Sequence, residues 1–376
     1  MRCACVIAAI LLTTCGAATA SVFTVTSVND LTPTGPLATS PSSHLTRYVT
    51  STGTAANFEL WYTDGQGSLP AYYVTGSYDG SSVTLSSPAA VTLDDNGLGW
   101  TTDTYAGYHL EVIKEGSTYH MINFRHEYLT GTTPTSFTKQ GVISYSPSLT
   151  DPGPPATNGS EDYGVAGFME DGGAYRVIQD TNFGRLFPAS TTDLAGMAWD
   201  QHGWAFHNSL PENGGAIQQP TATPGTANDP TYRLSPSGDL LKLDGSYLLF
   251  VPDNEDAGLG LVDLGTDITQ GIANQDWIYD PNGDTLTPPS PILGTSGNPG
   301  LGGTNTRDDF REATLLPTAN PGEFLVIYTA SWPGDSKQLG AAVIQLTSGE
   351  IPEPTSLLLL LGAAVSGLLL TRRRRK

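Results

Sequence analysis

One β-hairpin signal, between Gly238 and Asp253, constrains the fold of this chain more than any other feature. The stretch reads GDLLKLDGSYLLFVPD, so two apolar runs flank Asp244-Gly245. An Asp-Gly pair between two such runs is a strong hairpin signal, because glycine accepts the positive φ that a tight turn requires. Similar units recur, and a third strand-like run follows most of them. These units span residues 58–77, 109–124, 164–180 and 311–331.

The spacing of these units predicts a radial repeat. Each unit is anchored by the aromatic residue that opens its second run: Tyr72, Tyr119, Tyr175, Tyr247 and Phe324. Successive anchors lie 47, 56, 72 and 77 residues apart. Antiparallel units that recur at such intervals are typical of propeller blades. We therefore predict an all-β fold, a five-bladed β-propeller over residues 21–349, in which the alternating run at 22–28 closes the ring against the last blade.

The first twenty residues have the pattern of a signal peptide. Arg2 precedes an apolar run from Val6 to Leu12, and Ala18-Thr19-Ala20 provides the small residues of a cleavage site. The apolar run is too short for a transmembrane anchor. All three cysteines of the chain lie in this segment, so the mature protein contains no disulfide. We expect export, with residues 1–20 removed by signal peptidase.

The last residues, 350–376, have three parts. Pro352-Glu353-Pro354 precedes an apolar run at 355–370, and a basic cluster follows: Arg372, Arg373, Arg374, Arg375 and Lys376. This arrangement resembles the PEP-CTERM sorting signal of bacteria that make extracellular polymer. The resemblance implies a hydrophobic helix that anchors the chain transiently in the inner membrane, cleavage by exosortase near residues 352–354, and delivery to the cell surface or extracellular matrix. A plain tail anchor is the alternative, since hydropathy by itself allows either.

The charge of the mature body limits its partners. Removing Arg2 and the five basic tail residues leaves 11 of the 17 Lys and Arg residues, and removing Glu353 leaves 36 of the 37 acids. A body with a net charge of about −25 repels nucleic acid and anionic lipid. A neutral polysaccharide or a cation remains compatible with it, and so does a merely solvated acidic exterior.

Three acids are the candidate catalytic residues. Glu111 lies eight residues before its aromatic anchor, Asp239 lies eight before its own, and Glu312 lies twelve before its own across a longer turn. Gly167 takes the corresponding place in the unit at 164–180. Equal places in a radial repeat converge on the axis, and two neighbouring carboxyls with one raised pKa can perform glycoside hydrolysis. The alternative is that each acid is a structural residue of the channel.

Two of these units resemble a phrase of the five-bladed glycosidases, the family-43 and related arabinanase-like enzymes. HLEVIKEGSTYHMINF and GDLLKLDGSYLLFVPD share with that family an acid, an apolar pair, Lys-x-Gly and an aromatic run. The resemblance implies a propeller that acts on polysaccharide. The chain departs from the family in two ways: no Asp-Pro phrase opens its first unit, and Ala313-Thr314 follows Glu312 where the family's general acid precedes Gly-Pro.

Polar and aromatic residues provide candidate sugar-binding positions. The segment at 191–215 does not fit the strand repeat and combines aromatic rings with imidazoles, which suit sugar stacking, although buried packing is the commoner use of Trp. The string NFRHEYL adds a basic residue. The candidates are Trp199, His202, Trp204, His207 and Arg125.

No cofactor is expected from the sequence. The chain has no metal-binding His motif, and its mature part has no cysteine. The Asp/Asn strings at 253–256 and 280–284 offer oxygen ligands for Ca²⁺ but lack the full loop pattern, so they are more typical of Asx turns.

Three functions therefore stay open. The first is hydrolysis of an extracellular polysaccharide, and the second is a propeller that binds glycan without catalysis. The third is an adhesive or structural β-sandwich protein, if the repeat does not form blades.

Overall fold

The computed structural model describes residues 22–32, 35–37, 46–64, 71–100, 110–123, 125–146, 164–180, 186–202, 239–252, 259–268, 276–279, 308–331 and 338–349. The predicted signal peptide and the C-terminal sorting segment lie outside these residues. Strands make up the regular structure of the described part, and it contains no helix that is long and apolar enough to cross a membrane.

The strands form five sheets, each named here after its innermost strand. The β2 sheet contains β2 (Thr46–Thr54), β3 (Asn57–Asp64), β4 (Ala71–Tyr78) and β5 (Val83–Leu85), with β6 (Ala89–Ala90) paired to β4. The β8 sheet contains β8 (Glu111–Glu115), β9 (Thr118–Ile122), β10 (Glu127–Thr133), β11 (Ser136–Val142) and β7 (Thr92–Asp94). The β13 sheet contains β13 (Gly164–Asp171), β14 (Ala174–Asp180), β15 (Leu186–Thr191), β16 (Ala198–Gln201) and β12 (Ser144–Ser146).

The remaining two sheets have four strands each. The β17 sheet contains β17 (Asp239–Leu243), β18 (Ser246–Pro252), β19 (Leu259–Asp263) and β20 (Asp276–Tyr279). The β21 sheet contains β21 (Asp308–Pro317), β22 (Glu323–Ser331), β23 (Gln338–Gly349) and the N-terminal strand β1 (Val22–Asp30).

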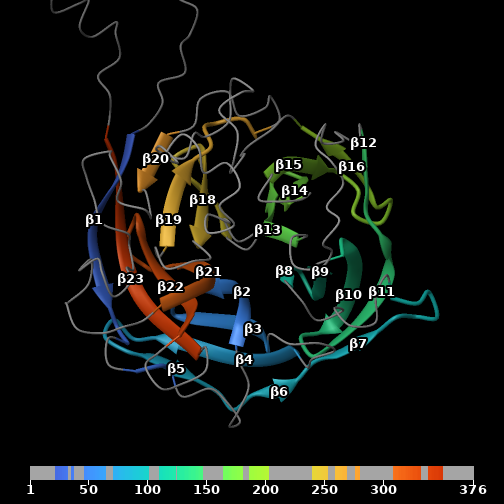
Figure 1. Cartoon of the computed structure of the whole chain (residues 1–376), viewed down its shortest axis with the longest axis horizontal. Helices are drawn as coiled ribbons and strands as arrows, with labels where there is room; N and C mark the ends of the chain where they lie inside the picture. The colour runs from blue at the N-terminus through green and yellow to red at the C-terminus, as the bar shows by residue number, and fades with distance from the viewer. Residues whose placement is uncertain are drawn as a thin grey trace, which may run out of the picture. The chain divides into compact units, whose positions relative to one another are not determined.

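The five innermost strands form a closed ring. Each of them contacts the next in the order β2, β8, β13, β17, β21, and β21 contacts β2 again. Figure 1 shows the sheets arranged around this common centre, with β2, β8, β13 and β21 facing it. The prediction of an all-β propeller is therefore confirmed, and the sandwich alternative is wrong because no sheet stacks on a single partner.

The N-terminal strand pairs with the last strand of the final sheet and so closes the propeller, as the sequence predicted. β1 lies beside β23, the last strand of the fold. Just beyond β1, the Leu31 N–H donates to the carbonyl of Ala341 at 2.9 Å. The Thr32 hydroxyl accepts the Ala341 N–H at 3.0 Å. Both ends of the folded chain therefore belong to one sheet.

The hairpin at Asp244-Gly245 has the expected geometry. Both residues have positive φ, 48° and 90°, and Leu243 pairs with Ser246 across the turn. Two positive φ values in a two-residue loop define a type I′ turn, whose twist matches that of the flanking strands.

The first unit begins one strand earlier than the sequence suggested. The innermost strand is β2, and Gly53 pairs with Phe58 at its hairpin. The aromatic position of this unit is therefore Phe58, whereas Tyr72 lies on the next strand. Residues 46–54 are rich in Thr and Ser, so the apolar pattern that marks the other inner strands is missing there.

The hydrophobic cores lie between neighbouring sheets. One core joins Leu60 of the β2 sheet to Leu325 of the β21 sheet, and another joins Trp61 to Met121 of the β8 sheet. Further cores fill the junctions of the β8 and β13 sheets and of the β17 and β21 sheets. Packing between sheets fixes the positions of the inner strands, which carry the candidate acids.

Candidate functional site

The three predicted acids all lie on innermost strands. Glu111 begins β8, Asp239 begins β17, and Glu312 lies in the middle of β21. Glu111 is 4% exposed and Glu312 is 0% exposed, whereas Asp239 is partly buried. Strand pairing aligns two other residues with Glu111 and Asp239. Glu111 and Asp239 each pair with the residue three positions after the aromatic anchor of their sheet. In the β2 sheet, Thr50 likewise pairs with the residue three positions after Phe58. Gly167 lies in a β-bulge at the corresponding place of β13.

Glu111 connects three neighbouring sheets. Its Oε2 accepts a hydrogen bond from the Thr50 hydroxyl at 3.1 Å. Its Oε1 accepts the N–H of Gly167 at 3.3 Å. One side chain on β8 therefore bonds to the inner strands on both sides of it.

Glu312 connects β21 to β2. Its Oε2 accepts the N–H of Val49 at 2.7 Å, while its own N–H donates to the Thr329 hydroxyl at 3.1 Å. Its Oε1 is buried with no hydrogen-bond partner among the described residues. Leaving an ionised oxygen in that state is costly, so this environment favours the protonated carboxyl.

Asp239 connects β17 to β21 in the same manner. Its Oδ2 accepts the Thr314 hydroxyl at 3.0 Å and the Leu315 N–H at 2.7 Å. The three acids thus repeat one device, in which a carboxyl on one inner strand accepts donors from the next. We call Glu111, Asp239 and Glu312 the central acids.

Burial raises the pKa of every central acid, and repulsion by a neighbouring acid adds to the shift for Glu111 and Glu312. Desolvation raises the pKa of Glu111 well above its ordinary value, and the charge of Asp239 adds to it. Desolvation also raises the pKa of Glu312, helped by the charges of Glu111 and Asp239. The pKa of Asp239 rises to about 6 by desolvation, although its hydrogen bonds oppose the change. The charge of Asp239 therefore acts on both glutamates, and the charge of Glu111 acts on Glu312.

Gly167 is required where β13 approaches β17. Its φ is +76°, a conformation that glycine adopts readily. A Cβ at this position would lie 2.4 Å from the backbone N of Leu240, the residue after Asp239. The glycine therefore allows two inner strands to approach closely and lets its N–H reach Glu111.

The aromatic candidate Trp199 is a core residue. It lies on β16, the fourth strand from the centre of the β13 sheet, and is 1% exposed. Its ring packs against Phe168 with centroids 6.2 Å apart. The predicted sugar-stacking role is therefore wrong for this ring, because burial removes its faces from any ligand.

Two of the other predicted sugar-binding residues, His202 and Arg125, lie in the described part of the chain and contact other residues there. His202 follows β16, and its Nε2 lies 2.8 Å from the Ser190 hydroxyl. Arg125 lies in the turn after β9, where its N–H donates to Asn123 Oδ1 at 3.0 Å. Trp204, His207 and both candidate Ca²⁺ strings lie outside the described residues. Within the described part, no three His, Cys, Asp or Glu residues are grouped closely enough to hold a metal ion.

A second set of acids, which sequence reasoning missed, lies toward the hairpin ends of the inner strands. Glu59 of β3 accepts Lys114 Nζ at 2.7 Å and the Tyr119 hydroxyl at 2.7 Å, both from the β8 sheet. Asp171 of β13 accepts Lys242 Nζ at 2.9 Å and the Tyr247 hydroxyl, both from the β17 sheet. We call these two groups the rim clasps.

The sequence does carry a signal for the rim clasps. Both use a Lys five residues before the aromatic anchor, and strand pairing places each Lys opposite its Tyr. The acid comes from the preceding sheet, which no local pattern identifies. Hydrogen bonds from Tyr247 and Lys242 lower the pKa of Asp171. Burial opposes ionisation of Glu59, but the hydrogen bonds from Lys114, Tyr119 and Tyr73 outweigh it and lower the pKa.

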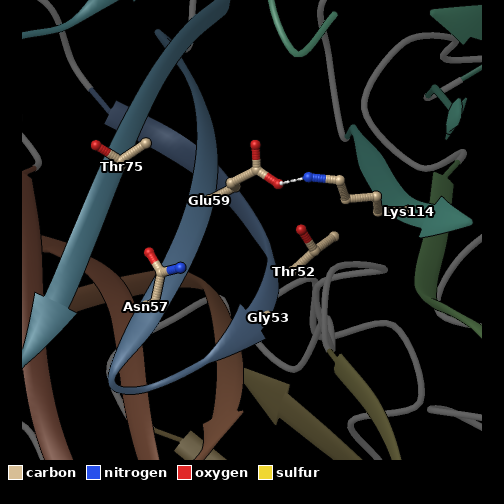
Figure 2. Close-up of a pocket in the computed structure, with 6 residues that line it drawn as sticks. All are labelled: Thr52, Gly53, Asn57, Glu59, Thr75 and Lys114. Atoms are coloured by element: carbon tan, nitrogen blue, oxygen red, sulfur yellow. Dashed lines mark hydrogen bonds and ion pairs between the residues drawn. The ribbon is translucent and has the colours of Figure 1, made fainter. Parts of the chain in front are cut away.

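A pocket of about 500 Å³ lies at the first rim clasp. Figure 2 shows the ion pair of Glu59 and Lys114 in its lining, with the other lining residues on the strands of the β2 sheet. We call it the rim pocket, and its lining residues are Thr52, Gly53, Asn57, Glu59, Thr75 and Lys114.

Comparisons with known proteins agree with the two parts of the chain. Residues 350–375 match the PEP-CTERM protein-sorting motif, which marks an exported protein that exosortase sorts to the cell surface. No curated protein sequence matches the chain.

The body shares its fold with glycosidase propellers. It matches the catalytic domain of the GH62 α-L-arabinofuranosidase from Coprinopsis cinerea with a TM-score of 0.51 and 14% identity, covering 88% of this chain and 99% of that one. It matches the α-L-arabinofuranosidase PaAbf62A from Podospora anserina, in complex with cellotriose, with a TM-score of 0.52 and 14% identity, covering 87% and 98%. A GH43_1 enzyme from Xanthomonas citri matches with a TM-score of 0.43 and 11% identity, covering 86% and 90%. At these identities the likeness shows the fold alone.

Proposed function

We propose that the propeller binds a neutral polysaccharide of the extracellular matrix without hydrolysing it. The observation that carries this proposal is the burial of Glu111 and Glu312, which are 4% and 0% exposed and bonded to neighbouring inner strands. A glycosidase needs two carboxyls that reach the glycosidic bond, one of them as proton donor. The contacts of these two carboxyls are those of residues that hold sheets together.

The ligand class is inferred from fold and charge. One structure with this fold, PaAbf62A, holds cellotriose, so the propeller shape is compatible with an oligosaccharide. The net charge of the mature body, about −25, repels anionic polymers. A neutral polysaccharide at the cell surface, where exosortase delivers the protein, satisfies both conditions.

Hydrolysis is the second candidate, and Asp239 favours it. This acid is partly buried rather than sealed, and its pKa of about 6 lies in the range of a general acid. Under this alternative, Asp239 donates the proton and a neighbouring central acid acts as base or nucleophile.

One experiment separates the two candidates. The mature protein is incubated with a panel of neutral and acidic polysaccharides, and binding and release of reducing sugar are both measured. We expect binding to neutral polymers with no sugar release. Sugar release that Asp239→Asn abolishes without lowering the Tm would establish the second candidate. Neither binding nor release would overturn both.

The sorting step has its own test. We propose that signal peptidase removes residues 1–20, that the apolar run at 355–370 anchors the chain transiently in the inner membrane, and that exosortase cleaves near residues 352–354. Mass spectrometry of the surface-associated protein should find no peptide from the basic cluster Arg372–Arg375. A mature form that retains this cluster would contradict cleavage and favour a plain tail anchor.

A further inference from the structure

The rim pocket has a balanced charge. Glu59 Oε2 lies 2.7 Å from Lys114 Nζ, and Glu59 Oε1 accepts the hydroxyls of Tyr73 and Tyr119 at 2.9 and 2.7 Å. Its pKa is lowered, so the carboxylate stays ionised beside the ammonium group at neutral pH. The two opposite charges cancel at short range, which leaves no net charge in the pocket to select an anion or a cation.

The pocket nevertheless offers several hydrogen-bonding groups. The side chains of Thr52, Asn57 and Thr75 make no hydrogen bond to any other described residue. Lys114 has three N–H donors and forms one ion pair, with Glu59. Hydroxyls, an amide and an ammonium group together can both donate and accept. A ligand with many hydroxyl groups and no charge complements such a set.

These groups are held in place before a ligand arrives. Lys114 is fixed by its ion pair and by the Tyr119 ring, whose centroid lies 4.8 Å from Nζ. The threonines lie on the strands β2 and β4, and Asn57 begins β3, so three paired strands set their spacing. A pre-positioned polar set loses less conformational entropy on binding than a flexible one. The volume of about 500 Å³ lies within the usual range for small-ligand sites.

We infer that the rim pocket is a saccharide-binding subsite, in which Lys114, Asn57 and Thr75 bond to the hydroxyls of a neutral sugar unit. The inference rests on the proposed polysaccharide binding and assigns it to a pocket that the central acids do not line. Glu59 acts as a positioning residue, because its oxygens already accept three donors from the protein. Lys114 supplies its remaining donors to the sugar.

The second rim clasp provides a matched control. Lys242 occupies the equivalent place in β17, bonds to Asp171 and lies 5.0 Å from the Tyr247 ring centroid. It does not line the rim pocket. Lys114→Ala and Lys242→Ala therefore remove the same kind of ion pair, and only the first removes a pocket donor. Thr75→Val removes a pocket hydroxyl with almost no change in shape.

The test measures binding of the mature protein and its variants to the neutral polysaccharide of the panel that the parent binds best, by affinity electrophoresis or calorimetry. We expect Lys114→Ala to weaken binding about tenfold or more, as for a lost charged hydrogen bond, and Thr75→Val about threefold to tenfold. Lys242→Ala should bind within twofold of the parent. The Tm of the two lysine variants should agree, which excludes unfolding as the cause.

Each other outcome overturns the inference. If the parent binds and all three variants bind equally, the subsite is wrong while the proposed function stands. If the parent binds no polysaccharide of the panel, the inference and the proposed function both fail. If Lys114→Ala weakens binding only to an acidic polysaccharide and added salt does the same, the pocket is an anion site.

Discussion

The central acids and the acids of the rim clasps are the same residue types, but their surroundings shift their pKa values in opposite directions. The central acids are buried among hydroxyl and main-chain N–H donors, and their pKa values are raised. The acids of the rim clasps contact Lys and Tyr at a partly exposed edge, and their pKa values are lowered. Both groups join adjacent sheets.

This difference shows that an acid at the centre of the ring need not be a catalytic group. A raised pKa favours the protonated form of a buried carboxyl, and in that form it bridges strands without an unpaired charge. An acid at the rim remains charged and contributes mainly through an ion pair that water and salt weaken. The predictions below test this contrast, from the largest expected effect to the smallest.

Gly167→Ala should have the largest effect. The added Cβ meets the backbone N of Leu240 at 2.4 Å, so the ring of inner strands must shift. We expect a loss of roughly 3–5 kcal/mol in the free energy of unfolding, measured by urea denaturation. Gly116→Ala is the matched control, because Gly116 also has positive φ but its Cβ would meet nothing within 4 Å. That variant should lose only about 1 kcal/mol. Equal losses would show that the close approach of β13 and β17 does not matter.

Glu312→Ala should have the second largest effect. It leaves the buried N–H of Val49 without its acceptor and opens a cavity between β21 and β2. We expect a loss of roughly 2–4 kcal/mol in the free energy of unfolding. Glu312→Gln keeps an acceptor and the side-chain shape, so it should lose less than about 1 kcal/mol at neutral pH. A large loss in the Gln variant would mean that the ionised carboxylate is the stabilising form.

The pH dependence of stability should report Asp239. Its pKa is about 6 in the folded protein and near 3.8 when unfolded, so the folded state binds more protons between these values. The contribution of this residue to stability therefore falls as pH rises from about 4 to about 6, by up to ~3 kcal/mol. Asp239→Asn should flatten this slope in urea titrations at several pH values. An unchanged slope in the variant would assign the effect to other groups.

Breaking the second rim clasp should have the smallest effect. Asp171→Asn removes the charge that pairs with Lys242, at a partly exposed edge, and should cost about 0.5–1 kcal/mol. Because the pKa of Asp171 is lowered in the folded protein, its contribution is present above the unfolded pKa and is lost as pH falls. The loss should shrink in high salt and at acidic pH, as followed by Tm. If Asp171→Asn lowers the Tm more at low pH than at neutral pH, then Asp171 does not differ from the central acids in the way proposed.

Local chemistry in the sequence determined the hairpins, the sorting tail and two of the three central positions. Asp244-Gly245 imposes its turn wherever the strands lie, and the eight-residue interval before the aromatic anchor placed Glu111 and Asp239 at equivalent levels. The interval for Glu312 is longer for two reasons: the turn between Pro317 and Phe324 is longer than in the other units, and Glu312 pairs with Thr329, five rather than three residues beyond its anchor. The strand β2 escaped detection, since a Thr-rich inner strand lacks the apolar signal.

Only the tertiary structure decided what these acids contact. Val49 and Glu312 are 263 residues apart in the chain, and Thr50 and Glu111 are 61 apart, so neither pair follows from a local pattern. The same holds for Glu59 and Lys114, which meet because the β2 and β8 sheets pack against each other. Residue type and spacing determine which side chains reach the ring or its rim. Packing between sheets determines whether the carboxyl of such a residue contacts a cation, a main-chain N–H or another carboxyl. That neighbour shifts the pKa of the carboxyl and so determines whether it is ionised.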